Sequence, residues 1–201
     1  APWGLGFRGN IENGIPNPSQ CVALTGSRDS TSYGATVTGD IAYGLVQRGI
    51  CVVSGLAYGI DAHAHRAALA GHQGTEAATI AVLAGGLDRD YPSGNAELAA
   101  AIRANGLTLS ELPPGSAPTR YRFLQRNRII AALAGVTCVV EARWRSGALN
   151  TAHHAETIAR HVAAVPGSVH SANSAGCHRL LKEGGAVLVT DAAELTELLA
   201  S

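Results

Sequence analysis

The residues best suited to chemistry stand in short turns that follow apolar runs, and the first of these turns is Gly26-Ser27-Arg28. Glycine lets the backbone turn sharply, serine supplies a hydroxyl and an N–H group, and arginine presents a planar fork that matches a phosphate. Ser32 then stands where it can cap a helix, and the amino end of a helix favours anions. The plainer interpretation is a strand-to-helix turn with a solvated arginine. The residue types nevertheless make this turn one candidate phosphate contact.

A second turn combines small residues with two polar side chains. Ser54, Gly55 and Gly59 can offer backbone N–H groups to a phosphate. Asp61 and His65 follow at the start of an expected helix, where capping and packing over the turn are favoured over contact with a ligand. The chain lacks the glycine spacing of dinucleotide-binding proteins and the G-x-x-x-x-G-K-[ST] spacing of P-loops. The turn thus predicts a phosphate cradle without a nucleotide cofactor.

The most distinctive basic stretch follows a proline-rich loop at 111–115 and mixes guanidinium groups with aromatic rings. Arginine pairs with phosphates, and an aromatic ring can stack on an unpaired base for about 1–3 kcal/mol. Two alternatives stay open: Phe123 belongs to the core, or Arg128 anchors a carboxylate such as Glu141. The candidate binding residues of this stretch are Arg120, Arg122, Phe123, Arg126, Asn127 and Arg128.

The fourth turn follows the apolar run that ends near Glu141. Arg145 precedes Ser146 and Gly147, which are expected to open a helix with free N–H groups. Positions 120–145 hold six arginines (120, 122, 126, 128, 143 and 145) against the single acid Glu141, although the formal net charge of the whole chain is zero. Such segregation can place one positive face on a neutral protein.

Catalytic and metal-binding patterns are missing from the sequence. The four cysteines have no C-x-x-C spacing, and the histidine pairs lack the H-E-x-x-H arrangement. We find no nucleophile beside a histidine and a carboxylate at a recognisable spacing. We therefore expect a binding protein that is not an enzyme and that takes no metal and no cofactor.

The elements that must position these turns alternate regularly. Apolar runs at 21–24, 51–53, 79–83, 107–109, 136–140, 161–165 and 186–189 are typical of strands that are covered on both faces. Helical patterns lie between and after them, at 32–48, 60–70, 95–104, 123–133, 148–159, 177–182 and 192–199. This alternation predicts an α/β fold with a doubly wound, mostly parallel sheet, in which the turns meet at the carboxyl edge.

Residues 1–20 predict an irregular lead-in with an edge strand near Leu5–Phe7, and residues 21–201 predict one Rossmann-like domain. The chain opens with Ala1-Pro2-Trp3 where a native product would start with Met, so we expect a processed fragment. No apolar run is long enough to span a membrane and no secretory leader is present, so we expect a cytoplasmic protein.

Taken in order, the motifs resemble those of the DNA-processing protein A (Smf) family. They are GSR…YG at 26–34, SGLAxGIDxxAH at 54–65, RNRIIA at 126–131, EAxxRSGxLxTA at 141–152 and VPGS…GCHRLL at 165–181. Two stretches depart from the family pattern, at 146–152, where SG-S-L-I-T-A is common, and before the RNR motif, where Phe-Pro is common.

The resemblance implies an extended Rossmann-like fold that binds single-stranded DNA and loads the RecA recombinase in natural transformation or DNA recombination. It also implies a homodimer, and it implies that a helical domain before this one and a winged-helix domain after it are absent from the chain. The DNA-binding residues that it implies are Gly26, Ser27, Arg28, Ser54, Gly55, Gly59, Arg120, Arg122, Phe123, Arg126, Asn127, Arg128, Arg145, Ser146 and Gly147.

Two other functions use the same type of sheet. A sensor domain would hold a small nucleotide-derived ligand in the same pocket. A phosphoribohydrolase-like enzyme would need a P-G-G-x-G-T-x-x-E motif, and Gly74-Thr75-Glu76 lacks the preceding glycines and lies before a strand. A dehydrogenase is excluded because the glycine fingerprint is missing.

Overall fold

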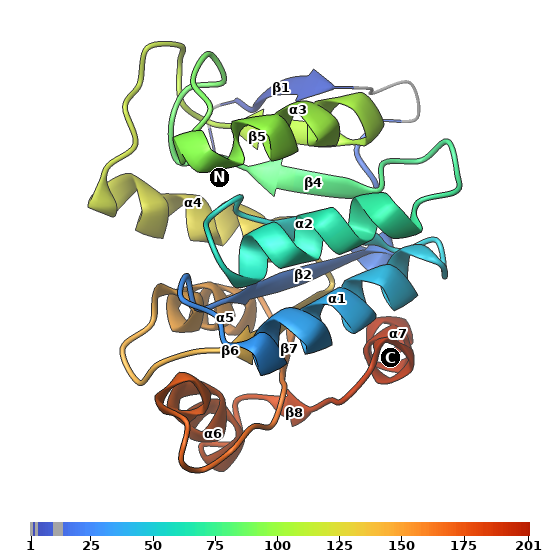
Figure 1. Cartoon of the computed structure of the whole chain (residues 1–201), viewed down its shortest axis with the longest axis vertical. Helices are drawn as coiled ribbons and strands as arrows, with labels where there is room; N and C mark the ends of the chain where they lie inside the picture. Colours follow the sequence, from blue (N-terminus) through green and yellow to red (C-terminus); the bar gives the residue numbers. More distant parts are fainter. Residues whose placement is uncertain (1, 3, 10–13) are drawn as a thin grey trace.

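The computed structural model describes residues 2, 4–9 and 14–201. Its centre is an eight-stranded sheet with the strand order β1-β5-β4-β3-β2-β6-β7-β8 (Figure 1). Every pairing is parallel except that of β1 with β5, which is antiparallel. The strands are β1 (Gly6–Gly9), β2 (Cys21–Gly26), β3 (Cys51–Ser54), β4 (Thr79–Val82), β5 (Leu107–Ser110), β6 (Val136–Glu141), β7 (His161–Ala164) and β8 (Val187–Leu188). The predicted doubly wound, mostly parallel sheet is confirmed.

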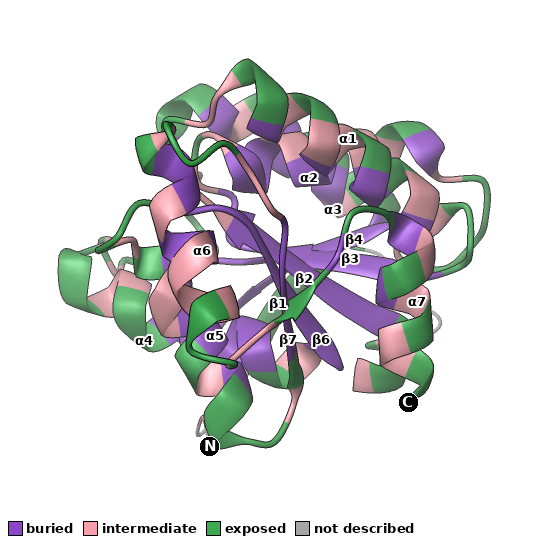
Figure 2. Ribbon diagram, turned by 90° about the horizontal axis from the view of Figure 1, so that it is seen from below, coloured by how far each residue is buried: buried purple, intermediate pink, exposed green. Residues whose placement is uncertain are grey.

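Helices cover both faces of the sheet, and Figure 2 shows most of the strands as a buried layer between them, whereas β1 and β8 are exposed. The helices are α1 (Ser32–Val46), α2 (Ile60–Gly71), α3 (Ala96–Asn105), α4 (Arg120–Leu133), α5 (Gly147–Thr157), α6 (Ala175–Lys182) and α7 (Ala192–Ala200). The sequence predicted all seven, with ends that differ by a few residues. The largest difference is α4, which begins at Arg120 instead of 123 because Thr119 caps it, accepting a hydrogen bond from the Arg122 N–H at 3.2 Å.

The core follows from the apolar runs. Strands β2, β3, β4 and β6 are buried along almost their whole length, so their side chains on both faces need helices against them. One cluster joins β2, β3 and β6 to α1, α2 and α7, and two other clusters join strands of the sheet to α4 and α5 on the opposite face. All four cysteines are buried and unpaired. The expected edge strand is present as β1, while residues 1, 3 and 10–13 of the expected lead-in lie outside the described residues.

A buried carboxylate fixes the start of α1. Glu141, at the end of β6, accepts hydrogen bonds from the Thr31 N–H at 2.9 Å and the Thr31 hydroxyl at 2.5 Å. A Cβ atom at position 34 would collide with this carboxylate, so Gly34 is required there. Thr31, and not Ser32 as expected, is the cap, since its hydroxyl accepts the Gly34 N–H at 3.1 Å. A negative charge at the amino end of a helix is favourable.

Buried His65 makes stability depend on pH. Thr79 donates its hydroxyl proton to the Val52 carbonyl, so it accepts from Nδ1 of His65 at 2.7 Å, and Nε2 has no partner. Burial lowers the pKa of His65 to about 3, and the positive charges of Arg126 and Arg66 act in the same direction. The unfolded chain therefore takes up a proton below pH ~6.5 that the folded chain does not.

We expect the free energy of unfolding to fall by about 1.4 kcal/mol per pH unit as the pH drops from about 6 to 5. This figure is the contribution of His65; Asp61 opposes it, because burial raises the pKa of its carboxyl above the ordinary value and the folded chain then keeps a proton that the unfolded chain has lost. Urea unfolding at several pH values, with NMR titration of the imidazoles, measures both effects. A His65 ring that titrates near pH 6 in the folded protein would contradict the expectation.

Within the described residues, no helix combines the length and the apolar character needed to cross a lipid bilayer.

Candidate nucleic-acid interface

A cavity of about 680 Å³ opens at the carboxyl edge of the sheet, where β2 ends and where α4 and α5 begin. This edge lies on the left in Figure 1, where the β4 arrow points. We call this cavity the basic groove. Its lining includes Thr25, Gly26, Arg28, Ala57, Asp61, Tyr91, Pro118, Thr119, Arg120, Phe123, Leu124, Arg126, Asn127, Arg145, Ser146, Gly147, Ala148, Asn150 and Thr151. Residues from all four segments singled out by the sequence thus line one site, the second of them through Ala57 and Asp61.

The turn after β2 is held rigidly by backbone hydrogen bonds. The Ser27 N–H donates to the Glu141 carbonyl at 2.8 Å, and the Ser27 carbonyl accepts from the Ile60 N–H at 3.1 Å. A Cβ atom at position 26 would lie 2.6 Å from both the Glu141 carbonyl and the Ile60 side chain, so only glycine fits. Ser27 is 4% exposed and sits under the surface. Arg28 is therefore the residue of this turn whose side chain is exposed at the groove.

Arg126 forms part of the floor of the groove. It is 5% exposed, and its guanidinium donates to the Gly55 carbonyl at 2.6 Å and to the Val82 carbonyl. Burial lowers its pKa to about 10, while the nearby Asp61 carboxylate raises it, so the group stays charged at neutral pH. The sequence placed Arg126 among the contacts of the DNA backbone. In the structure its hydrogen bonds tie α4 to the ends of β3 and β4.

The second turn supports the groove from below. Ser54 is fully buried and donates to the Leu24 carbonyl at 2.6 Å. A Cβ atom at position 55 would collide with the Arg126 guanidinium. Gly59 has a φ of 74°, and a Cβ there would collide with the Ser27 carbonyl. None of these three residues lines the groove, so they position Arg28 and Arg126.

Asp61 and His65 take the roles favoured from the sequence. A carboxylate oxygen of Asp61 accepts from the Ala57 N–H at 3.3 Å, and the His65 ring is buried beneath the turn. Asp61 also lines the groove.

Three exposed arginines supply the positive charge of the groove: Arg28, Arg120 and Arg145. None of them forms an ion pair with any residue in the described part of the chain. Beside them, α5 begins at Gly147, with the Ser146 hydroxyl accepting from the Ala148 N–H at 3.2 Å. Unpaired guanidinium groups next to a helix amino end favour an anionic ligand.

Two arginines of the 120–128 cluster lie outside the groove. Arg122 donates to the carbonyl of Ala117, which steadies the loop before α4. Arg128 is paired with Glu111. The alternative that Arg128 anchors a carboxylate is therefore supported, but Glu141, the example named from the sequence, is wrong, because that side chain binds Thr31.

Phe123 lies among charged and aromatic neighbours at the groove. The Arg28 guanidinium carbon is 4.7 Å from the centre of the ring, and that of Arg126 is 5.6 Å away. The ring of Tyr91 is tilted against it with 5.8 Å between centroids. Sequence reasoning missed Tyr91, which comes from the loop between β4 and α3. An aromatic residue in a loop with several glycines after a buried strand was the only signal available.

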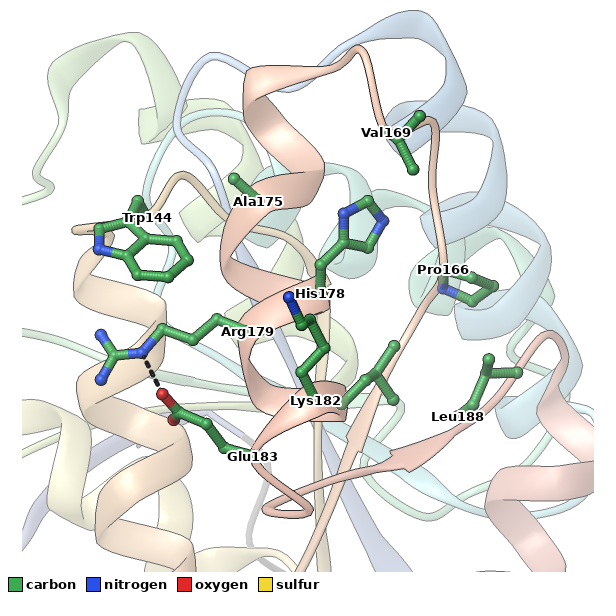
Figure 3. Close-up of a pocket in the computed structure, with 10 residues that line it drawn as sticks. Trp144, Pro166, Val169, Ala175, His178, Arg179, Lys182, Glu183 and Leu188 are labelled. Carbon is green, nitrogen blue, oxygen red and sulfur yellow. Dashed lines mark hydrogen bonds and ion pairs between the residues drawn. The ribbon is translucent and has the colours of Figure 1, made fainter.

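A different kind of cavity, of about 710 Å³, lies between α6, the segment after β7, and β8 (Figure 3). Its lining is mostly apolar, and Figure 3 shows Trp144 beside Arg179, which is paired with Glu183 at 2.9 Å. Arg179 also lies 5.2 Å from the Trp144 ring. None of the binding residues predicted from the sequence lines this apolar groove.

The acidic residue that was weighed for a phosphoribohydrolase-like enzyme, Glu76, lies at the opposite edge of the sheet from the basic groove. Glu76 lies before β4, on the amino side of the strands, whereas the basic groove is at their carboxyl side. Among the described residues, no group of three or more potential metal ligands comes together.

Fold and groove together define a Rossmann-like α/β domain with a cationic site at the carboxyl edge of its sheet. The chain belongs to the DNA recombination-mediator protein A family, whose model matches residues 1–200.

Individual relatives agree with this membership. The putative DNA processing protein DprA of Mycobacterium tuberculosis is 51% identical over 180 residues, which are 90% of this chain and 45% of that protein. DprA of Streptococcus pneumoniae superposes with a TM-score of 0.86 at 41% identity, over 96% of this chain and 65% of that one. DNA processing protein A of Helicobacter pylori, described with a single-stranded DNA binding mode, gives a TM-score of 0.88 at 30% identity, over 99% and 87%. The chain thus spans about half the length of its mycobacterial relative.

Proposed function

We propose that this chain binds single-stranded DNA in the basic groove and acts as a recombination mediator without turning over a substrate. The observation that carries the proposal is the meeting of three unpaired arginines, Arg28, Arg120 and Arg145, at one cavity. Their charge suits successive phosphates, and aromatic rings beside them suit unpaired bases. The single-stranded DNA binding described for the Helicobacter pylori relative supports the same ligand class.

Phosphates and bases would play different parts in this site. The guanidinium groups neutralise phosphates, which releases counterions and makes affinity depend on salt. The rings offer stacking only to bases that are not paired in a duplex. The groove therefore favours a single strand over a double strand by the stacking contribution.

Binding of an oligo-dT strand at increasing salt tests the proposal. Three arginines at the groove predict a log–log slope of about −2, since each neutralised phosphate contributes about −0.7 for single strands. Duplex DNA of the same length is expected to bind more weakly. Fluorescence anisotropy with a labelled strand measures both. An affinity that does not change with salt would contradict the proposed contacts between the arginines and the phosphates.

Partners of the whole protein are part of the same proposal. From the family resemblance, the chain forms a homodimer and passes the strand to the RecA recombinase. One feature suits self-association: β8 is the last strand of the sheet, and its Val187 and Leu188 are each 51% exposed. The outer edge of such a strand offers backbone groups for pairing with another chain. We also propose that the protein acts in the cytoplasm, in natural transformation or DNA recombination.

A further inference from the structure

A third cavity, of about 620 Å³, lies beside the amino end of α1. Its lining comes from residues 31–33, from Glu141 at the end of β6, and from the segment 166–174 after β7. We call it the hydroxyl pocket, because most of its lining residues carry a hydroxyl group and none carries a basic side chain. It shares no residue with the basic groove and only Pro166 with the apolar groove. Its volume is within the range of small-molecule sites.

Glu141 places a buried negative charge at this pocket. Its side chain is 1% exposed and accepts hydrogen bonds only from the N–H and the hydroxyl of Thr31 among the described residues. No basic side chain in that part of the chain pairs with it. Buried charges in proteins are normally paired, and the amino end of a helix supplies only about half a positive charge. The pocket therefore favours a cation.

Ser174 gives a second, independent indication of a ligand. It is 4% exposed and lines the pocket, yet its hydroxyl has no hydrogen-bond partner among the described residues. Buried hydroxyl groups are hydrogen-bonded in the large majority of cases. The hydroxyls of Ser32 and Ser171, which also line the pocket, have no partner within the same residues. These oxygens can accept hydrogen bonds from a ligand that carries several N–H groups.

Tyr33 and Pro166 give the pocket an apolar wall. The Tyr33 hydroxyl donates to the Pro166 carbonyl at 2.6 Å, which joins α1 to the segment after β7, and the side chain is 46% exposed. Burial and, next, the negative charge of Glu141 raise the pKa of this hydroxyl, so that charge acts on the wall of the pocket. The face of an aromatic ring also attracts a cation. An alkyl chain that ends in a positive charge fits these surroundings.

Anions and divalent metal ions fit the pocket less well. An anion would meet the charge of Glu141 without any basic side chain in the lining. A divalent metal ion needs several oxygen ligands, and the pocket holds one carboxylate, whose two oxygens both accept from Thr31. Among the described residues, no set of three potential metal ligands comes together. An organic cation is the remaining class of charged ligand.

We propose that the hydroxyl pocket binds a primary alkylammonium group, whose charge is held by Glu141, whose N–H groups donate to Ser174 and whose alkyl chain packs against Tyr33. Free diamines carry this group, and so does the end of a lysine side chain. The inference does not depend on the binding of DNA, because the hydroxyl pocket and the basic groove have no residue in common.

Isothermal titration calorimetry of the whole chain at neutral pH tests the proposal with two probes. These are 1,4-diaminobutane, a free diamine, and acetyl-lysine methylamide, a lysine side chain, and both are charged at this pH. We expect one molecule of at least one probe to bind per chain, and the tighter probe identifies the source of the ammonium group. 1,4-Butanediol has the same chain length without the charge, and we expect it to bind at least about tenfold more weakly.

Two variants locate the site, with a third as the control. Glu141→Gln keeps an acceptor for Thr31 and removes the charge, so we expect it to weaken binding of the amine by at least about tenfold. Asp40→Asn removes the same charge from an exposed position on α1 outside the pocket, and we expect it to bind like the parent protein. Ser174→Ala removes a hydroxyl without a protein partner, so we expect it to fold and to bind at least about fivefold more weakly.

Thermal unfolding shows which variants fold, and Ser174→Ala keeps the test decisive if Glu141→Gln does not. The proposal is overturned if neither amine binds the folded parent protein, or if the diamine and the diol bind equally well. Unchanged affinity in folded Ser174→Ala also overturns it. Equal losses in Asp40→Asn and Glu141→Gln do the same, because the effect would then come from the overall charge of the protein.

Discussion

Arg126→Met is expected to lower the free energy of unfolding by about 3–5 kcal/mol. The guanidinium is buried and donates to the carbonyls of Gly55 and Val82, which lose that donor in the variant. Asp61, itself 5% exposed, would lose the neighbouring positive charge that favours its ionised form. Removing one member of a buried charged set leaves the other uncompensated, and this dominates the cost. Urea or thermal unfolding followed by circular dichroism measures the change.

Arg122→Met provides the comparison on the same helix. Arg122 is only partly buried and its guanidinium contacts the Ala117 carbonyl. We expect its replacement to cost about 1 kcal/mol or less, in line with one hydrogen bond near the surface. Equal losses in the two variants would show that Arg126 has no special structural role. It would then be free to act mainly as a DNA contact.

Arg28→Ala is expected to weaken oligo-dT binding by at least about tenfold while the stability of the fold changes little. A hydrogen bond to a charged group contributes about 1.5–3 kcal/mol. The side chain is exposed and forms no ion pair with the described residues, so its removal leaves no buried group without a partner. The log–log salt slope should become shallower by about 0.7, the contribution of one phosphate. Anisotropy titrations at several salt concentrations give both values.

Arg48→Ala controls for the loss of one positive charge. Arg48 is exposed just after α1, at the amino edge of the sheet, and contacts the Gly44 carbonyl. Its replacement changes the net charge as Arg28→Ala does, but it leaves the groove intact. If both variants lost the same affinity, the effect would come from overall charge and not from a contact of Arg28.

Much of the fold could be predicted from the sequence because parallel strands that are covered on both faces give continuous apolar runs. The runs at 21–24 and 136–140 match β2 and β6, and the turns after them have to meet at the carboxyl edge. This topological rule, and not any single motif, brings Arg28 together with Ser146. The edge strand β1 could also be predicted from the sequence, but its register against β5 could not.

The division of labour among the arginines could not be predicted. Arg122, Arg126 and Arg128 have the same chemistry, and their neighbours give α4 no clean apolar stripe from which to read its orientation. Only the structure shows that Arg126 faces the core and that Arg128 reaches Glu111. The position of Tyr91 at the groove could not be predicted for another reason. The path of the long loop from β4 to α3 depends on contacts such as Asp90–Arg103.

The central claim is that single-stranded DNA binds in the basic groove. Oligo-dT carrying 5-iododeoxyuridine can be cross-linked to the protein by irradiation, and the modified peptides can be identified by mass spectrometry. We predict adducts in 86–95 and 118–126, the segments that bring Tyr91 and Phe123 to the basic groove. Adducts confined to 166–188, which line the apolar groove, with none in those two segments, would contradict the proposed site.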